Sequence, residues 1–238
     1  MLMTLSSHNT TFYTMKRVAI GLILFLLAHL GGNARAQVSG GPKVGINFPS
    51  HYVKETERTV RAKNLHLIGF HAGGELLVQL PVVGMEFELD ALFTRKGYRY
   101  SMVLPDVVEK VEPDITATTA AQTSRITQEL YYLEFPIKIN YSLGLAGTGL
   151  FAGVGPTIGV GLFGWTRADR EKSVAIGWGD GADEYKRYDF SLGAHLGVRV
   201  AGVQLSGYFD WGFVNISNRA SVTRSNYNGG ISLAYLFQ

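Results

Sequence analysis

Acidic side chains at alternate positions are the most chemically suggestive feature of the sequence. Glu86, Glu88 and Asp90 occupy every second residue, so in a β-strand all three point to one face. Two carboxylates in unlike environments can serve as acid and base in catalysis. They can equally be neutralised by basic side chains in a narrow barrel, whose interior has room only for side chains. We favour a polar network filling the lumen, comprising Lys43, His71, Glu75, Glu86, Glu88, Asp90, Glu134, Lys138, Asp189, His195, Arg199 and Asp210.

Two histidines of this set, His71 and His195, lie on different expected strands near acidic residues. Histidine with carboxylates is a common ligand set for transition metals. The sequence has no close ligand spacing around either residue, and a neutral histidine bonded to Asp210 or Tyr208 is the commoner arrangement. We therefore predict no metal site and no cofactor.

Glycines at Gly153, Gly155, Gly159 and Gly161 superficially resemble a dinucleotide-binding loop. That motif needs a helix directly after the loop, and here the glycines alternate along an expected strand instead. The sequence therefore gives no support for a nucleotide site.

An outer-membrane enzyme of the protease or acyltransferase type is the alternative from a different functional class. It would need a serine, a histidine and an acid that converge at a strand end. His51 and His66 in the first loop are the only candidates, and no recognisable set surrounds them. We predict that the protein is not an enzyme.

The elements that position these residues are β-strands, and residues 188–200 and 203–214 show this best. Apolar and polar side chains alternate in both segments, and only Ala201 and Gly202 separate them. A two-residue hairpin turn places Val200 opposite Val203, which joins the apolar faces of the two strands. The same register pairs His195 with Tyr208 and Arg199 with Gln204.

Six further segments alternate in the same way, which predicts eight strands in total. The connections after the first, third, fifth and seventh strands are long and polar, and the others are short. Glycine is abundant at 29 residues and only 17% of residues are charged, which favours an all-β protein. The remaining expected strands cover residues 43–48, 66–80, 83–96, 126–141, 150–165 and 230–238.

The first 36 residues are expected to be an upstream extension and a cleaved secretory signal peptide, with the barrel domain over residues 37–238. Lys16 and Arg17 precede an apolar run from Val18 to Leu30, and Ala34-Arg35-Ala36 resembles a cleavage site. As a helix this run would span about 20 Å, less than the ~30 Å hydrocarbon core of a bilayer. Without this segment basic and acidic residues are equal in number, so the net charge of +3 does not indicate nucleic-acid binding.

The regular alternation predicts an eight-stranded antiparallel up-and-down transmembrane β-barrel. Even strand number, long loops at one end, short turns at the other and a signal peptide are typical of outer-membrane barrels. Both termini are then periplasmic, and a soluble lipid-binding barrel is a weaker alternative. The side chains expected to face lipid are Phe87, Leu89, Leu133, Phe135, Leu192, Leu196, Leu205, Phe209, Trp211 and Phe213.

Several segments resemble the PorT-type outer-membrane β-barrel proteins of the Bacteroidota. They are LDALFTRKGYRY (89–100), YYLEFPIKINYSLG (131–144), FAGVGPTIGVGLFG (151–164), YDFSLGAHLGVRV (188–200) and the final ISLAYLFQ, with GPKVGINFPS (41–50) similar to the first strand of that family. The resemblance implies an eight-stranded barrel in the outer membrane. It implies little about activity, because most members of the family have no assigned role; the founding member is tied to protein secretion.

We therefore expect a non-enzymatic outer-membrane barrel with a structural, binding or secretion-accessory role. Its expected partner is outer-membrane lipid, and the outer loops, where charges of both signs are concentrated, are the candidate site for a protein partner. Loops on a rigid scaffold are where recognition is usually found.

Overall fold

The alternating segments of the sequence form a closed ring of antiparallel strands in a computed structural model. It describes residues 38–55, 62–65, 67–103, 108–112, 115–118, 123–145, 148–169, 172–181, 184–218 and 222–237. The predicted signal peptide and upstream extension lie outside these residues and stay a prediction. The ring contains β1 (Val38–Asn47), β4 (Gly69–Gln79), β5 (Met85–Val103), β8 (Thr123–Leu145), β9 (Thr148–Ala168), β11 (Tyr188–Val200), β12 (Val203–Gly212) and β13 (Val222–Tyr235).

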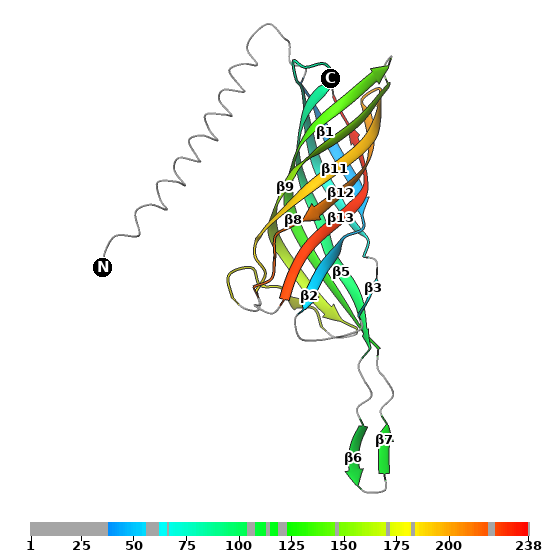
Figure 1. The fold of residues 1–238 in the computed structure, drawn as a ribbon, viewed down its shortest axis with the longest axis vertical. Coiled ribbons are helices and arrows are strands. Elements are labelled where there is room, and N and C mark those ends of the chain that lie inside the picture. The colour runs from blue at the N-terminus through cyan, green and yellow to red at the C-terminus, as the bar shows by residue number, and fades with distance from the viewer. Residues whose placement is uncertain are drawn as a thin grey trace, which may run out of the picture. The chain divides into compact units, whose positions relative to one another are not determined.

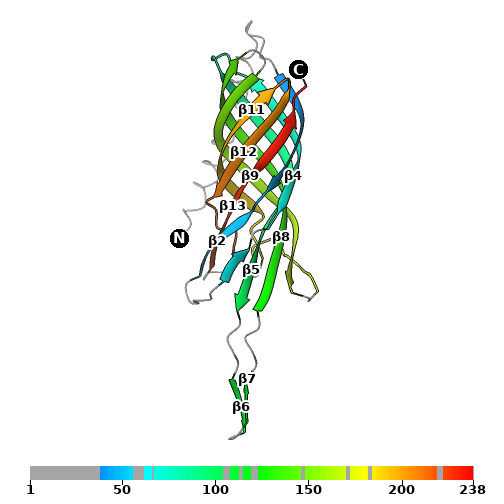
Figure 2. The same cartoon turned by 90° about the vertical axis from the view of Figure 1, so that its right-hand side faces the viewer.

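Each of these strands pairs with its neighbour in the order given, and β13 pairs with β1 to close the ring. The strands are tilted against the long axis, as Figures 1 and 2 show from two directions. Closure leaves no unpaired edge along the wall, and successive side chains point alternately into the ring and away from it. The predicted eight-stranded antiparallel up-and-down barrel is therefore confirmed.

The hairpin of β11 and β12 has the register expected from the sequence. Val200 pairs with Val203, Arg199 with Gln204 and His195 with Tyr208. Ala201 and Gly202 form the turn with φ angles of 49° and 83°. Two positive φ angles are what a hairpin turn of this length requires.

The turn between β4 and β5 is longer than we expected. The expected strands 66–80 and 83–96 leave only Pro81 and Val82 for this turn, and a tight turn there would place Glu75 opposite Glu88, which the structure contradicts. The turn runs from Pro81 to Gly84, and Glu75 pairs with Asp90. Proline cannot adopt the positive φ that a two-residue hairpin needs, whereas Gly84 has a φ of 76°.

The expected long loops also contain regular structure, which corrects the sequence interpretation. β2 (Ser50–Glu55) continues along β13, and β3 (Ala62–Leu65) pairs with β5. β5 and β8 stay paired as far as Val103 and Thr123, beyond which β6 (Val108–Glu112) pairs with β7 (Ile115–Thr118). β10 (Val174–Ala175) pairs with β9. Backbone pairing does not require an apolar face, so polar strands of this kind leave no alternation to detect.

In the described residues, no helix is long and apolar enough to cross a membrane.

The left-handed φ of Ala201 generates a first prediction. An L-residue with a Cβ pays roughly 1–2 kcal/mol in this conformation, and asparagine tolerates it best after glycine. Ala201→Asn is therefore expected to raise the free energy of unfolding of the refolded protein by about 1 kcal/mol, measured by urea titration. Ala201→Val, with a branched Cβ, is the matched control and should lower it. Equal stability of the two variants would contradict the assignment of the turn.

Candidate functional site

The interior of the ring is built around the ammonium group of Lys43. Its Nζ atom lies 3.0 Å from Glu75 Oε2, 2.9 Å from Glu88 Oε1 and 2.7 Å from Asp90 Oδ2. All four side chains are at most 3% exposed. Lys43 lies on β1, whereas the acids lie on β4 and β5, so the fold brings Lys43 to residues more than 30 positions further along the chain. One buried cation thus forms ion pairs with three converging carboxylates.

The three carboxylates of this cluster are close enough together to hold a metal ion. The Lys43 ammonium group already contacts all three, and Lys138 Nζ lies 3.6 Å from Glu88 and 3.7 Å from Asp90. Buried charges are tolerated when they are paired and hydrogen-bonded, as they are here. The arrangement is that of an internal salt-bridge network.

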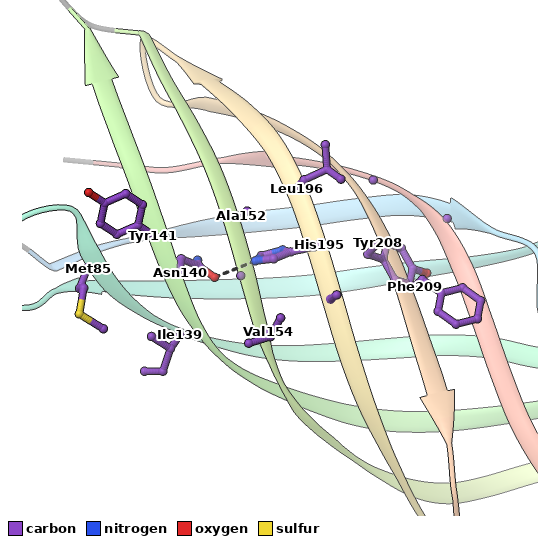
Figure 3. A pocket seen from close by; sticks show the side chains of 14 residues that line it. Met85, Ile139, Asn140, Tyr141, Ala152, Val154, His195, Leu196, Tyr208 and Phe209 are labelled. Atoms are coloured by element: carbon purple, nitrogen blue, oxygen red, sulfur yellow. Dashed lines mark hydrogen bonds between the residues drawn. The ribbon is translucent and has the colours of Figure 1, made fainter.

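The second carboxylate oxygen of Glu88 extends this network across β8, β9 and β11. Asn140 Nδ2 donates to Glu88 Oε2 at 2.7 Å, and Asn140 Oδ1 lies 2.7 Å from His195 Nε2. Figure 3 shows this bond passing over β9. There the register places Gly153 between Asn140 and His195, and a Cβ on Gly153 would lie 1.9 Å from Asn140 Oδ1. The glycine keeps the path of the bond open.

The expectation of a histidine bonded to Asp210 or Tyr208 therefore holds for His71, whereas the partner of His195 is Asn140. His71 is the histidine that contacts Tyr208, at 3.3 Å, and it also lies 2.9 Å from Ser232. Asp210 is buried on β12, beside Gly193 of the neighbouring strand β11. Alternation predicts that a side chain points inward, but not how far it reaches across the lumen.

Towards the end of the barrel with the short turns, Arg199 makes a bidentate contact with Glu86. Its Nη1 and Nη2 atoms donate to the two carboxylate oxygens at 2.9 and 3.1 Å. Arg199 also donates to Gln204 Oε1, and Gln204 Nε2 donates to Glu75. These contacts connect the Arg199–Glu86 ion pair to the Lys43 cluster.

Towards the loop end, Lys96 performs the role that Lys43 has at the centre. It forms an ion pair with Glu134, and its Nζ lies 3.8 Å from Asp189. Asn226 donates to Asp189 at 2.7 Å. We did not include Lys96 among the predicted network residues, although it has the same parity as Glu86, Glu88 and Asp90 on β5. That parity was the signal that would have identified it.

The centre of the lumen contains a small cavity. Its volume is about 20 Å³, and it is bordered by Lys43, Asp90, Thr94, Lys138 and Ser206 among others. A single water needs roughly 10–15 Å³ of such volume, so this cavity has the size of one or two waters. The side chains around this cavity are therefore closely packed.

Three side chains between β9 and β11 cover the inner side of the wall at the loop end. Ile176, Trp178 and Tyr185 pack against a buried cluster of Leu130, Tyr132 and Ile216. The Trp178 ring lies against Gly161, where an added Cβ would be 2.3 Å from the ring. The glycines of β9 thus make room for side chains, as their position on a strand suggested.

His51, the described member of the candidate catalytic pair, lies inside this end of the barrel. Its ring is 4.6 Å from that of Tyr98, and neither ring nitrogen has a hydrogen-bond partner among the described residues. Burial, and then the positive charges of Arg224 and Lys96, hold the pKa of His51 well below its usual range. His66 lies outside the described residues. Neither a serine nor an acid contacts the His51 ring to form a catalytic set in the described part.

The outward face of the ring is almost entirely apolar. Leu196 is 70% exposed, Trp211 69% and Phe209 50%. Phe87, Leu89, Leu133 and Phe135 have the same outward parity and are half-buried by neighbours. The surface is hollowed over Ala152 and Gly207 by an open groove of about 740 Å³, which Figure 3 shows beside Tyr141, Leu196 and Phe209.

Aromatic side chains and one ion pair end the apolar surface on the side of the long loops. Tyr131 stacks on Phe163 with ring centroids 4.8 Å apart, and Phe163 stacks on Trp165. Arg95 Nη2 and Trp165 Nε1 both donate to Glu129, at 2.6 and 3.0 Å. Tyr98 and Tyr100 do not belong to this aromatic group, since they share the parity of the inward positions, and Tyr98 contacts His51 inside.

The fold and the interior define a small closed β-barrel with a polar lumen and an apolar exterior. Neither a protein-family model nor a curated protein matches the chain. Membership of the PorT-type family therefore stays a prediction.

Several solved structures are similar to this chain at 12% sequence identity, and each match covers 84% of the chain. They are Ail, the attachment invasion locus protein of Yersinia pestis, in complex with the heparin analogue sucrose octasulfate (99% of that chain, TM-score 0.34), Neisserial surface protein A (99%, 0.36) and the outer membrane protein OprG from Pseudomonas aeruginosa (94%, 0.40). Similarity at this level does not carry a function over from these proteins.

The Lys43 cluster generates the second prediction. Lys43→Met removes the cation and leaves three carboxylates without it, which is expected to lower the free energy of unfolding by about 3–5 kcal/mol. Guanidinium titration of the refolded protein measures this. Lys186→Met, at an exposed position, is the matched control and should change stability by less than about 0.5 kcal/mol. The double variant Lys43→Met/Glu88→Gln should recover part of the loss. A fully stable Lys43→Met protein would contradict the role of this contact.

Proposed function

We propose that this chain is an integral outer-membrane β-barrel protein without enzymatic activity. Its lumen is filled by side chains, and its long loops are available for a structural, binding or secretion-accessory role. One observation carries the proposal: ionised side chains are buried inside the ring, while large apolar side chains cover its outside. In water this arrangement exposes the surface that the hydrophobic effect would bury.

A bilayer accounts for this inverted distribution. Hydrocarbon offers no hydrogen bonds, so a spanning sheet must be closed, and this ring is. The outward apolar run of β8 from Tyr131 to Tyr141 matches the roughly 9–11 residues that a tilted strand needs to cross a bilayer. The aromatic residues around Trp165 then lie at the interface, as in other membrane barrels.

The arrangement of the connections supports an orientation. β1 begins and β13 ends beside the short turns, since Val38 pairs with Val78 and Leu236 N–H bonds to Gly202 O. Short turns are periplasmic in outer-membrane barrels, so both ends of the barrel domain are periplasmic in this proposal and the long loops face outward.

The PorT-type resemblance favours a secretion-accessory role among the roles open to such a barrel. A side-chain-filled lumen leaves the loop end and the outer wall as the surfaces for partners. Cross-linking of whole outer membranes followed by mass spectrometry would identify a protein neighbour directly. The only candidate catalytic residues for the enzyme alternative are His51 and His66. Hydrolase or acyltransferase activity of the refolded protein that is lost in the His51→Ala variant would favour that alternative over the present proposal.

The third prediction separates a membrane barrel from a soluble lipid-binding barrel. Leu196 lies near the middle of the outward run of β11 and is highly exposed. Arginine at the midplane of a bilayer costs about 2–4 kcal/mol, so Leu196→Arg should destabilise the protein refolded in lipid vesicles by that amount. In a soluble barrel the same substitution would add a charge to a surface in contact with water and would leave the stability of the protein unchanged. Asp180→Arg, in an exposed loop, is the control.

The filled lumen generates the fourth prediction. The protein reconstituted in planar bilayers is expected to show no large ohmic single-channel currents, because the Lys43 and Arg199 contacts occupy the cross-section. Large, steady currents from the folded, heat-modifiable form would refute a side-chain-filled lumen, while leaving the membrane location intact.

A further inference from the structure

Three arginines from neighbouring strands form a basic patch on the outer wall at the loop end. Arg99 of β5 pairs with Thr127 of β8, which in turn pairs with Arg167 of β9. Arg125 lies two residues beyond Thr127 on β8 and therefore on the same outward face. Adjacent strands are about 4.8 Å apart, so the three side chains surround Thr127. We name Arg99, Arg125 and Arg167 the outer arginine patch.

None of the three guanidiniums forms an ion pair with an acid in the described part of the chain. Arg99 Nε donates to Thr127 Oγ1 at 3.2 Å, and Arg167 Nε donates to Ser173 Oγ at 3.1 Å. Asp169 is the nearest acid in register, and its carboxylate accepts the backbone N–H of Arg125 at 2.9 Å. Arg125 and Arg167 are exposed. Arg95, two rows closer to the apolar surface, differs because it forms an ion pair with Glu129.

The rows of outward side chains give the patch a defined level. Proceeding along β8 from the apolar surface, Tyr131 lies beside Phe163, then Glu129 beside Trp165, then Thr127 beside Arg167. Aromatic rings favour the boundary between hydrocarbon and headgroups. The patch begins one row beyond that boundary, which is the level of lipid headgroups in a bilayer.

We propose that the outer arginine patch binds the phosphate groups of anionic lipids in the leaflet that faces the long loops. This inference rests on the proposed membrane location and adds a ligand class and its residues. Arginine is suited to the task because its planar guanidinium donates two parallel hydrogen bonds to a phosphate. Thr127 and Ser173 already orient Arg99 and Arg167, which leaves the remaining N–H groups of both guanidiniums for the ligand.

The position of the patch favours lipid over a soluble anion. Its side chains stand on the outside of the wall, directly beyond Trp165, rather than on the inner side of the mouth. A phosphate held there is attached to a molecule whose acyl chains lie on the apolar surface below. The acyl chains and the phosphate are therefore bound together, which a free phosphate cannot reproduce.

The test compares lipid A with its dephosphorylated form, two lipids with the same acyl chains. Full-length protein is reconstituted in phosphatidylcholine vesicles containing equal amounts of both, and the lipids that co-purify are quantified by mass spectrometry. Attraction of anionic lipid amounts to about a fivefold change per basic residue at low salt. Arg99→Gln/Arg167→Gln should therefore reduce the preference for phosphorylated lipid about thirtyfold, and 1 M salt, where the Debye length is about 3 Å, should reduce it in the wild type.

Lys186→Gln/Arg187→Gln is the matched control, since it removes the same charge from exposed positions outside the patch. This variant should keep the wild-type preference. An unchanged preference in Arg99→Gln/Arg167→Gln, or complete displacement of lipid A by inorganic phosphate, would overturn the inference. Failure of the wild type to insert into the vesicles would instead refute the proposed membrane location, so the two failures are distinguishable.

Discussion

Closure of the strand ring between β1 and β13 is the constraint on which the rest of the structure depends. Lys43 pairs with Ala234 and Asn47 with Gly230 across this seam. Once the ring is closed, every strand has one face inside and one outside, and a shift by one residue in any strand would exchange them. Lys43 on β1 and the acids of the neighbouring strands β4 and β5 then share the inner side of the ring.

The narrowness of the ring determines what its interior can be. In a barrel of eight strands, side chains from opposite walls meet. Charged groups that meet away from water must pair, which accounts for the chain of contacts from Arg199 through Glu75 and Lys43 to Lys138. Small residues are needed where these contacts cross a strand, as Gly153 shows below the Asn140–His195 bond. Salt bridges and glycines are thus two consequences of one geometry.

The sequence was sufficient to predict the eight strands of the ring and the register of one hairpin, because both depend on the local pattern of residues. Ala201 and Gly202 fit a single turn geometry. Between β4 and β5, the alternation was also consistent with a shorter, two-residue turn that begins at Pro81, although proline cannot adopt the positive φ that such a turn requires. Contacts across the lumen could not be predicted, since the partner of His195 depends on how β8 and β11 are staggered around the ring. The polar strands β2 and β3 were missed because alternation identifies a strand only where one face is apolar.

The two ends of the barrel differ in how their charged side chains are paired, and this difference indicates where a partner can bind. Near the short turns, Arg199 and Glu86 satisfy each other inside the wall. At the loop end, Trp178 and Tyr185 close the inner side, while the guanidiniums of Arg125 and Arg167 remain exposed outside. A closed interior provides no route for a solute, so recognition by this protein has to use its loops and its outer wall. In the described part of the chain these two guanidiniums form no ion pair, and they lie one row beyond the aromatic boundary; in the proposed membrane the surrounding lipid would supply their counter-charge.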